Sequence, residues 1–520
     1  MSAQSAAFRS SLNAGSALMA GFVSGLLAPL LVLLLVLMGV PFGAALPVGL
    51  GAFALLFFVL VPQVPSEWVA FLKSRSRTAF VLLGLASLLV VVAMARLGVF
   101  MFDPNLKQYS LTPKIEFMVK HTCLAGYLSA GVLAEQGKEN LFDLSLYKSP
   151  AMDAVLPRVE PLERDYYAYP PQFLLLPKLM LSISRDFYAV RAGWYILYAA
   201  AALLSMLVVA RWVGGREGAV LGALTPVIWI SLPTLVNVQL GNIHLLVYGL
   251  CLGAMIAFDR KRHALGGAML AFAILAKIFP GVLGIYLLVQ RKWKAALWTA
   301  GFGVVYTAVA FVAVGEKPFV DYLTSAVPRI SSGELFDFVW NFTPAILVNY
   351  SPFGVPFKLQ LVGVPIADPL AVARAVIAVY SLLVVALAVA VAHRLHKRET
   401  GGEEGSRFKL TQVVVWLALL SLSSFRSPFA PWTYCAVGGV WLFASYVPFL
   451  RSGAKYLVPY ILGWFVISIY GPPIVGPMVA FTLVAQTVLY VTGFWIALKV
   501  SAPASAPEPV PGAVGPAALS

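Results

Sequence analysis

The chain alternates between long apolar runs and short polar stretches. A transmembrane helix needs about 20 mostly apolar residues, and many of the runs approach or exceed that length. Their pattern predicts an all-α, polytopic integral membrane protein. The runs are 17–40, 43–62, 79–102, 187–210, 218–236, 241–258, 295–314, 371–393, 410–424, 429–450, 456–471 and 477–498.

The further run 264–290 has strongly basic sequences on both sides, 260–262 before it and 291–294 after it. Both flanks are expected on the same side of the membrane. The run would then enter the membrane and return, either as a hairpin of two short helices turning near Pro280 or as a re-entrant segment. The total is 12 to 14 membrane spans.

The basic residues set the orientation, because cytoplasmic loops are enriched in Lys and Arg. With the N-terminus inside, the cytoplasmic segments hold 20 of the 37 basic residues and only seven of the 22 acidic ones. We therefore expect both termini in the cytoplasm and two long segments, 103–186 and 315–370, outside. The membrane is expected to be the plasma (inner) membrane.

Composition agrees with this picture, since 60% of the residues are hydrophobic and only 11% are charged. These values exclude a soluble enzyme and a disordered chain. The net charge of +15 does not indicate a nucleic-acid partner, because the basic residues lie in short loops between apolar runs. The three cysteines form neither a disulfide framework nor a metal-binding pattern.

The predicted organisation has five parts. They are a cytoplasmic N-terminus (1–16), an N-terminal transmembrane hairpin (17–62), a core (79–450), a C-terminal hairpin (456–498) and a disordered Pro/Ala tail (501–520).

The first outside segment carries a helical pattern over 113–136, which begins at a proline and stops before Gly137. We expect one amphipathic helix there, lying on the membrane surface. Asp103 stands where the third span emerges, and His121 lies on the expected helix. The sequence Tyr169-Pro170-Pro171 then introduces an apolar run of about 10 residues, which is too short to span the membrane.

Polar residues at membrane depth are functional candidates, because burying them there is costly. Lys277 stands in the middle of the 264–290 run. Asn242 and His244 belong to a polar cluster near the outer end of a span, and Arg426 lies at the outer mouth of two spans, where an arginine suits a phosphate.

Four pieces of the sequence, in this order, resemble glycosyltransferase family 87 of the GT-C superfamily. They are HTCLAGYLSAGVLAEQGKENLFDLSLY, YAYPPQFLLLP, a long piece running from VQLGNIHLL through AKIFP to QRKW, and FRSPFAPWTY. They cover roughly residues 80–450. The resemblance implies a GT-C-like bundle and a hexosyltransferase, mannosyltransferase-like, that uses a polyprenyl-phosphate sugar.

The resemblance also implies which residues act. The family places a catalytic Asp a few residues before a Tyr and a stretch of small residues, which here begins at Tyr127. Counting back reaches 121–123, where no acid stands. Either His121 replaces the Asp as the base, which is our preference, or Asp103 reaches the site. The family's His near the last piece is replaced by Thr433-Tyr434.

The remaining candidates would bind substrate. Lys277 and Arg426 would face the donor phosphate, while Asn242, His244, Tyr169 and Gln172 would contact the substrate. A lipid-linked sugar is itself the donor, so no cofactor or metal is expected. The acceptor would be a hydroxyl on a glycolipid, glycan or polyol outside the membrane, and the single displacement would invert the sugar. Two alternatives are a lipid-linked-sugar flippase or transporter and a non-catalytic subunit of a glycan assembly.

Overall fold

The computed structural model describes residues 11–137, 140–148, 156, 158–451 and 453–503, and these are almost entirely helical. Seven helices are long and apolar enough to cross a membrane. They are α2 (Ala14–Leu37), α3 (Phe42–Leu60) with its 3-10 extension η1 (Val61–Gln63), α5 (Arg77–Phe102), α10 (Phe187–Val213), α16 (Trp293–Val314), α22 (Pro369–Thr400) and α26 (Val475–Ser501). The prediction of an all-α, polytopic membrane protein is confirmed.

An eighth span would result if α11 (Gly215–Trp229) and α12 (Leu232–Leu240) cross together, with a bend of 64° between them. The other expected runs form shorter helices, and the total of 12 to 14 spans depends on counting these as well. They are α13 (His244–Asp259), α14 (His263–Ala276), α15 (Gly281–Val289), α23 (Ser406–Ser424), α24 (Trp432–Tyr446) and α25 (Ala454–Ser468).

Local sequence accounts for where several helices begin. Asn13 forms a capping box with Ser16 at the start of α2, while Asp186 and Asp368 cap α10 and α22 with their carboxylates. The break between α11 and α12 precedes Pro233, which lies in the first turn of α12, where a missing N–H costs nothing.

The outer helices and the central ones bury different surfaces. Most of α3 and α16 is exposed apolar surface, with Leu50 and Val304 as examples. By contrast, α23 is buried almost along its whole length between α22, α24 and α26. This is the arrangement expected of a bundle whose rim faces lipid.

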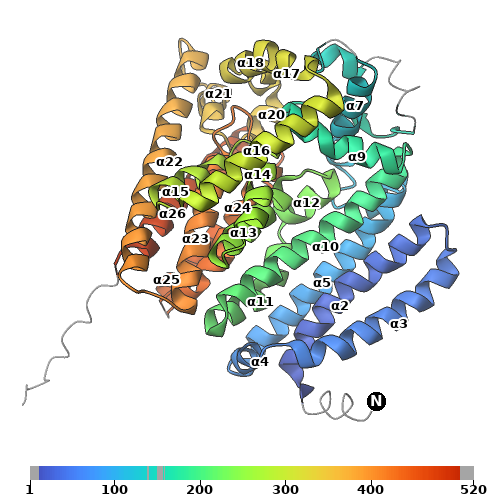
Figure 1. The fold of residues 1–520 in the computed structure, drawn as a ribbon, viewed down its shortest axis with the longest axis vertical. Coiled ribbons are helices and arrows are strands. Elements are labelled where there is room, and N and C mark those ends of the chain that lie inside the picture. Colours follow the sequence, from blue (N-terminus) through green and yellow to red (C-terminus); the bar gives the residue numbers. More distant parts are fainter. Residues whose placement is uncertain (1–10, 138–139, 149–155, 157, 452, 504–520) are drawn as a thin grey trace, which may run out of the picture.

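Short elements gather at one end of the bundle, which we call the site end (Figure 1). From the first long segment they are η2 (Lys107–Tyr109), α6 (Glu116–Lys120), β1 (His121–Thr122), α7 (Cys123–Glu135), η3 (Leu144–Lys148), β2 (Glu163–Arg164), η4 (Pro171–Leu174) and α9 (Leu175–Ile183). From the second they are α17 (Lys317–Asp321), η5 (Tyr322–Ala326), α18 (Val327–Ser332), η6 (Glu334–Phe336), α19 (Phe338–Asn341), α20 (Thr343–Val348), η7 (Pro352–Gly354) and α21 (Val355–Leu361).

The two long segments contact each other at the site end. The backbone N–H of Asn140 donates to the carboxylate of Asp321 at 3.0 Å, and the rings of Phe142 and Tyr322 lie 5.5 Å apart. The two segments predicted to lie outside therefore form one layer.

The loops predicted to be cytoplasmic also contact one another. Lys292 pairs with Glu399 at 2.7 Å, and Ser406 donates to Glu217 at 2.7 Å. Two short elements, α4 (Ser66–Lys73) and η8 (Val447–Phe449), both pack against α11. In Figure 1 α4 lies at the end opposite the site end. Residues 1–10 and 504–520, which include most of the predicted tail, lie outside the described residues.

The single amphipathic helix predicted over 113–136 is wrong. The chain forms α6 and α7, with the two extended residues of β1 between them. The break arises because β1 pairs in parallel with β2, His121 opposite Glu163. Residues 123–133 of α7 are all buried, so this helix lies inside the protein and not on a surface.

Candidate active site

The site is built where the β1–β2 pair brings two distant parts of the first long segment together. The pairing places Asp165, just after β2, beside the start of α7. Gly126 permits this approach, because a Cβ at that position would lie 3.0 Å from the carbonyl oxygen of Tyr166 and 3.1 Å from that of Asp165. A glycine lets this backbone lie where it does, because a Cβ at 126 would force it to shift by a few tenths of an ångström.

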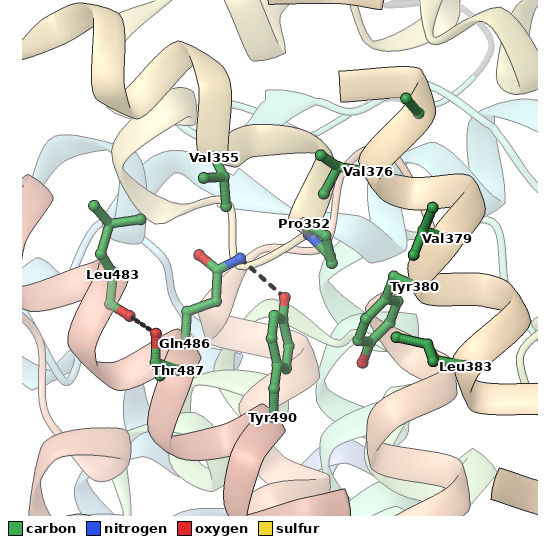
Figure 2. A pocket seen from close by; sticks show the side chains of 11 residues that line it. Pro352, Val355, Val376, Val379, Tyr380, Leu383, Leu483, Gln486, Thr487 and Tyr490 are labelled. Carbon is green, nitrogen blue, oxygen red and sulfur yellow. Dashed lines mark hydrogen bonds between the residues drawn. The ribbon is translucent and has the colours of Figure 1, made fainter. Parts of the chain in front are cut away.

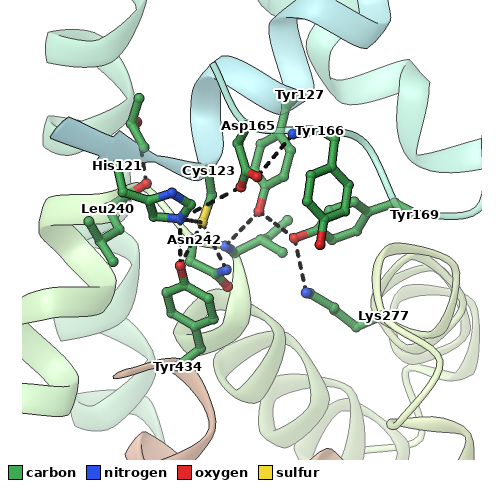
Figure 3. A network of polar contacts seen from close by, with 12 residues as sticks. His121, Cys123, Tyr127, Asp165, Tyr166, Tyr169, Leu240, Asn242, Lys277 and Tyr434 are labelled. Atoms are coloured by element: carbon green, nitrogen blue, oxygen red, sulfur yellow. Dashed lines mark hydrogen bonds and ion pairs between the residues drawn. The ribbon is translucent and has the colours of Figure 1, made fainter. Parts of the chain in front are cut away.

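His121 lies at the centre of a compact polar cluster (Figure 3). Its Nε2 is 2.7 Å from the Tyr434 hydroxyl, 3.6 Å from a carboxylate oxygen of Asp165 and 3.6 Å from the Cys123 sulfur. The Cys123 S–H also donates to the Tyr434 hydroxyl at 3.4 Å. The His121 and Asp165 side chains keep 16% and 22% of their surface exposed, so solvent reaches this cluster.

Electrostatics favours an ion pair in this cluster. Burial lowers the pKa of His121, but the Asp165 carboxylate and Cys123 outweigh it and raise the pKa to about 9. Burial raises the pKa of Asp165, and His121 opposes that rise. At neutral pH the proton resides on the imidazole, and Asp165 is the group with a free lone pair.

Lys277 enters the site from another direction. Its backbone is extended, and it lies in the break between α14 and α15 and not within a helix. The ammonium donates to the Tyr169 hydroxyl at 3.0 Å and lies 4.2 Å from the centre of that ring. The Tyr169 hydroxyl is in turn hydrogen bonded to the Tyr127 hydroxyl at 3.0 Å.

The turn between α12 and α13 connects the two halves of the site. The Asn242 amide donates to the Cys123 sulfur at 3.2 Å, and the N–H of Ile243 donates to the Tyr127 hydroxyl at 3.4 Å. This turn is held by Gly241, whose left-handed conformation ends α12. The cluster around His121 and the chain from Lys277 are thus one connected network.

The structure brings four of the residues proposed from the sequence into this network: His121, Lys277, Tyr169 and Asn242. His244 lies next to it. Its N–H donates to the side chain of Asn242, and its ring stacks on Phe279 with 4.9 Å between centres.

The other three candidates have different surroundings. Asp103 ends α5 and accepts from the backbone and side chain of Asn105 in a local turn. Gln172 donates to Thr307 of α16 at 3.0 Å. Arg426 follows α23, and its buried Nε has no hydrogen-bond partner among the described residues.

Sequence reasoning missed Asp165, Cys123, Tyr127 and Tyr434 as site residues. One signal existed for Asp165, which stands four residues before Tyr169 and so belongs to the same stretch as the Tyr-Pro-Pro sequence. Its contact with His121 depends on the pairing of β1 with β2, which no sequence pattern predicts.

A comparison with protein families finds one match, in which the model of glycosyltransferase family 87 covers residues 167–423, just under half of the chain. The matched region includes Tyr169, Asn242 and Lys277, whereas His121, Asp165 and Tyr434 lie outside it. A comparison with curated proteins finds no match. Residues 167–423 are thus similar to glycosyltransferase family 87, and this match supports a membrane glycosyltransferase.

Proposed function

We propose that this protein transfers a hexose from a polyprenyl-phosphate sugar to an acceptor hydroxyl at the outer face of the membrane, with inversion. The observation that carries the proposal is the single network that joins the Asp165–His121 pair to Lys277. A carboxylate and a cation on two sides of one site are what a single displacement at a sugar phosphate requires.

The step needs a base for the acceptor hydroxyl, and Asp165 has the better claim to that role. The resemblance implies a catalytic Asp near 121–123, and Asp165 supplies a carboxylate 3.6 Å from His121. The acceptor oxygen would give its proton to Asp165 and bond to the anomeric carbon. His121 would then position the carboxylate, while the sequence-based preference made His121 itself the base.

The leaving group is the polyprenyl phosphate, which departs with the electron pair of the anomeric C–O bond. Lys277 would stabilise the charge that develops on it, because a fixed cation beside a forming anion lowers the barrier. The Tyr169 hydroxyl holds the Lys277 ammonium in position.

A lipid-linked donor is supported by an apolar groove of about 510 Å³ between α22 and α26, below η7 (Figure 2). Apolar side chains such as Val379 and Leu483 make up most of its lining. Tyr380 on its wall donates to the Leu422 carbonyl at 2.8 Å, four residues before Arg426, the second candidate for a phosphate contact. Such a groove suits an isoprenoid chain.

The outer location is supported by the layout of charge, because the site lies at the end of the bundle that holds the two long segments. The strongly basic loops lie elsewhere in the sequence and contact one another. Since basic loops mark the cytoplasmic side, the site end would face outwards.

The test uses the full chain in nanodiscs with radiolabelled polyprenyl-phosphate mannose and an envelope lipid extract as the source of acceptor. We expect labelled glycoside and free polyprenyl phosphate in equal amounts. Asp165→Asn should lower transfer by about 100-fold or more, while Asp103→Asn should leave it within about threefold, as expected for a residue outside the site.

A His121→Gln variant separates the two candidate bases. If His121 only positions Asp165, the His121→Gln variant should keep part of the transfer activity. The Asp165→Asn variant should keep much less. The reverse order would return the role of base to His121. Donor movement across the bilayer without sugar transfer would favour a flippase, and neither activity would favour a non-catalytic subunit.

A further inference from the structure

Three side chains with metal-binding atoms converge in the site, His121, Cys123 and Asp165 (Figure 3). The first two stand two residues apart at the start of α7, and the third comes from the segment after β2. One imidazole nitrogen, one sulfur and one carboxylate oxygen lie within 4.8 Å of one another.

The distances fit a tetrahedral zinc ion. Zinc binds His nitrogen at about 2.0–2.1 Å and Cys sulfur at about 2.3 Å, which places neighbouring ligand atoms about 3.4–3.6 Å apart. The His121 nitrogen is 3.6 Å from the Cys123 sulfur and 3.6 Å from the Asp165 oxygen. Two of the three separations therefore match, and the Tyr434 hydroxyl, 2.7 Å from the same nitrogen, would have to shift for an ion to bind there.

The surroundings of the Cys123 sulfur supply a second, independent observation. The Asn242 amide donates to it at 3.2 Å, and the Cys123 S–H in turn donates to the Tyr434 hydroxyl at 3.4 Å. An outer hydrogen bond of this kind holds a ligand side chain in place for a metal ion. Cys251 is also buried, and among the described residues no hydrogen-bond donor is directed at its sulfur.

We propose that His121, Cys123 and Asp165 bind one zinc ion at the site end of the protein. A nitrogen, a sulfur and an oxygen ligand suit zinc, whereas magnesium and calcium prefer oxygen alone. Three protein ligands leave a fourth position for water or a substrate hydroxyl. The Tyr434 hydroxyl, 2.7 Å from the imidazole nitrogen, adjoins that position.

Binding would replace protons, because the ligands must be unprotonated. The Cys123 thiol and the His121 imidazole give up their protons to solvent, and the ion takes their place as the positive partner of Asp165. The other carboxylate oxygen of Asp165 accepts the N–H of Tyr166 and retains a lone pair. The zinc site is therefore compatible with the proposed transfer, and it holds whether or not the chain transfers a sugar.

The test measures zinc in the purified full chain, prepared with a tag that contains no histidine. Protein stripped with a chelator, reloaded with zinc and desalted is analysed by mass spectrometry of the metal. We expect about one zinc per chain, and at least a tenfold loss of bound zinc in Cys123→Ala, because removing a ligand costs more than removing an outer partner. The matched control is Cys251→Ala, which should retain the ion.

Cobalt gives a direct view of the sulfur ligand. Cobalt-loaded wild-type protein should show a sulfur-to-cobalt absorption band that is absent in Cys123→Ala and present in Cys251→Ala. If Cys123→Ala does not fold, as judged by gel filtration, His121→Gln serves as the second variant.

Less than about 0.1 zinc per chain in the wild type, or equal zinc in Cys123→Ala and Cys251→Ala, would overturn the inference. Its failure is distinguishable from failure of the proposed function. Transfer by protein that binds no zinc leaves the glycosyltransferase proposal standing. Zinc bound by protein that transfers nothing leaves the metal site standing alone.

Discussion

Two of the lysines that the structure describes, Lys277 and Lys358, donate hydrogen bonds inside the protein, and their surroundings differ in an instructive way. Both ammonium groups lie over a tyrosine ring, Lys277 at 4.2 Å from Tyr169 and Lys358 at 5.2 Å from Tyr350. Lys358, on α21, is fully buried, whereas Lys277 keeps part of its surface exposed. An unpaired buried charge is costly, so each needs a reason to be there.

The two lysines differ in the further hydrogen bonds that their partners make. Lys358 donates to the Gln486 side chain at 3.2 Å, and the amide of Gln486 donates to the Ser351 carbonyl and the Tyr490 hydroxyl. That cluster is closed on itself and joins α21 to α26. The partner of Lys277 is a hydroxyl that leads on to Tyr127 and the rest of the site. Burial alone therefore does not identify a functional cation, whereas the destination of its hydrogen bonds does.

The largest effect should come from removing each charge in turn. Lys277→Met should lower sugar transfer by about 100-fold or more, since it removes the cation beside the leaving phosphate. Lys358→Met should leave transfer within about threefold, because its cluster is structural. Initial rates on polyprenyl-phosphate mannose in nanodiscs compare the two. Equal losses of transfer in both variants would contradict the distinction between a catalytic Lys277 and a structural Lys358.

A smaller effect, on stability, should appear when the partner of Lys358 is removed. Gln486→Leu leaves the ammonium and the Ser351 carbonyl without their bonds, at a cost of about 2 kcal/mol. Thermal unfolding in detergent should show a lower midpoint. The double variant Lys358→Met with Gln486→Leu should recover most of that loss, and no recovery would mean that the two side chains are not coupled.

Tyr169→Phe tests the first link between Lys277 and the site. It removes the hydroxyl that holds the ammonium but keeps the aromatic ring beneath it. We expect about a tenfold fall in kcat with little change in stability, as for a lost hydrogen bond to a charged group. Tyr350→Phe is the control beside the other lysine, and it should leave kcat unchanged.

The smallest effect concerns pH. Burial lowers the pKa of Lys358 to about 7, well below the usual value of about 10.4. Between these values the unfolded chain holds up to one proton more than the folded chain, so this residue makes stability rise with pH, by about 1.4 kcal/mol per pH unit at most.

As the pH rises from 7 to about 9, the unfolding midpoint of the wild type should therefore increase relative to that of Lys358→Met. A constant difference between the two proteins over that range would show that Lys358 does not change its protonation on unfolding.

The two lysines also show what the sequence can predict. Lys277 was a candidate because it interrupts an apolar run three residues before Pro280, and the helices α14 and α15 end and begin around it as expected. Lys358 lies in a polar outside segment, where a lysine looks ordinary. Its burial depends on how α21 packs against α26.

The same limit applies to the site. Apolar runs of about 20 residues specify spans on their own, which is why the fold class was predictable. The pairing of His121–Thr122 with Glu163–Arg164 involves two residues on each side. So short a strand shows no recognisable alternation of apolar and polar residues. That pairing both interrupts the expected helix over 113–136 and brings Asp165 to His121, so one unpredictable contact decides both outcomes.

Gly126 has a consequence for how this site would tolerate change. It has no side chain and takes part in no chemistry, yet the backbone of Asp165 and Tyr166 passes so close that a side chain there would force this backbone to shift. In a saturation mutagenesis survey scored by function, Gly126 would be as intolerant as the reacting groups themselves. Low tolerance to substitution at Gly126 would then show that the residue lies close to the reacting groups. It would not show that the residue takes part in the reaction.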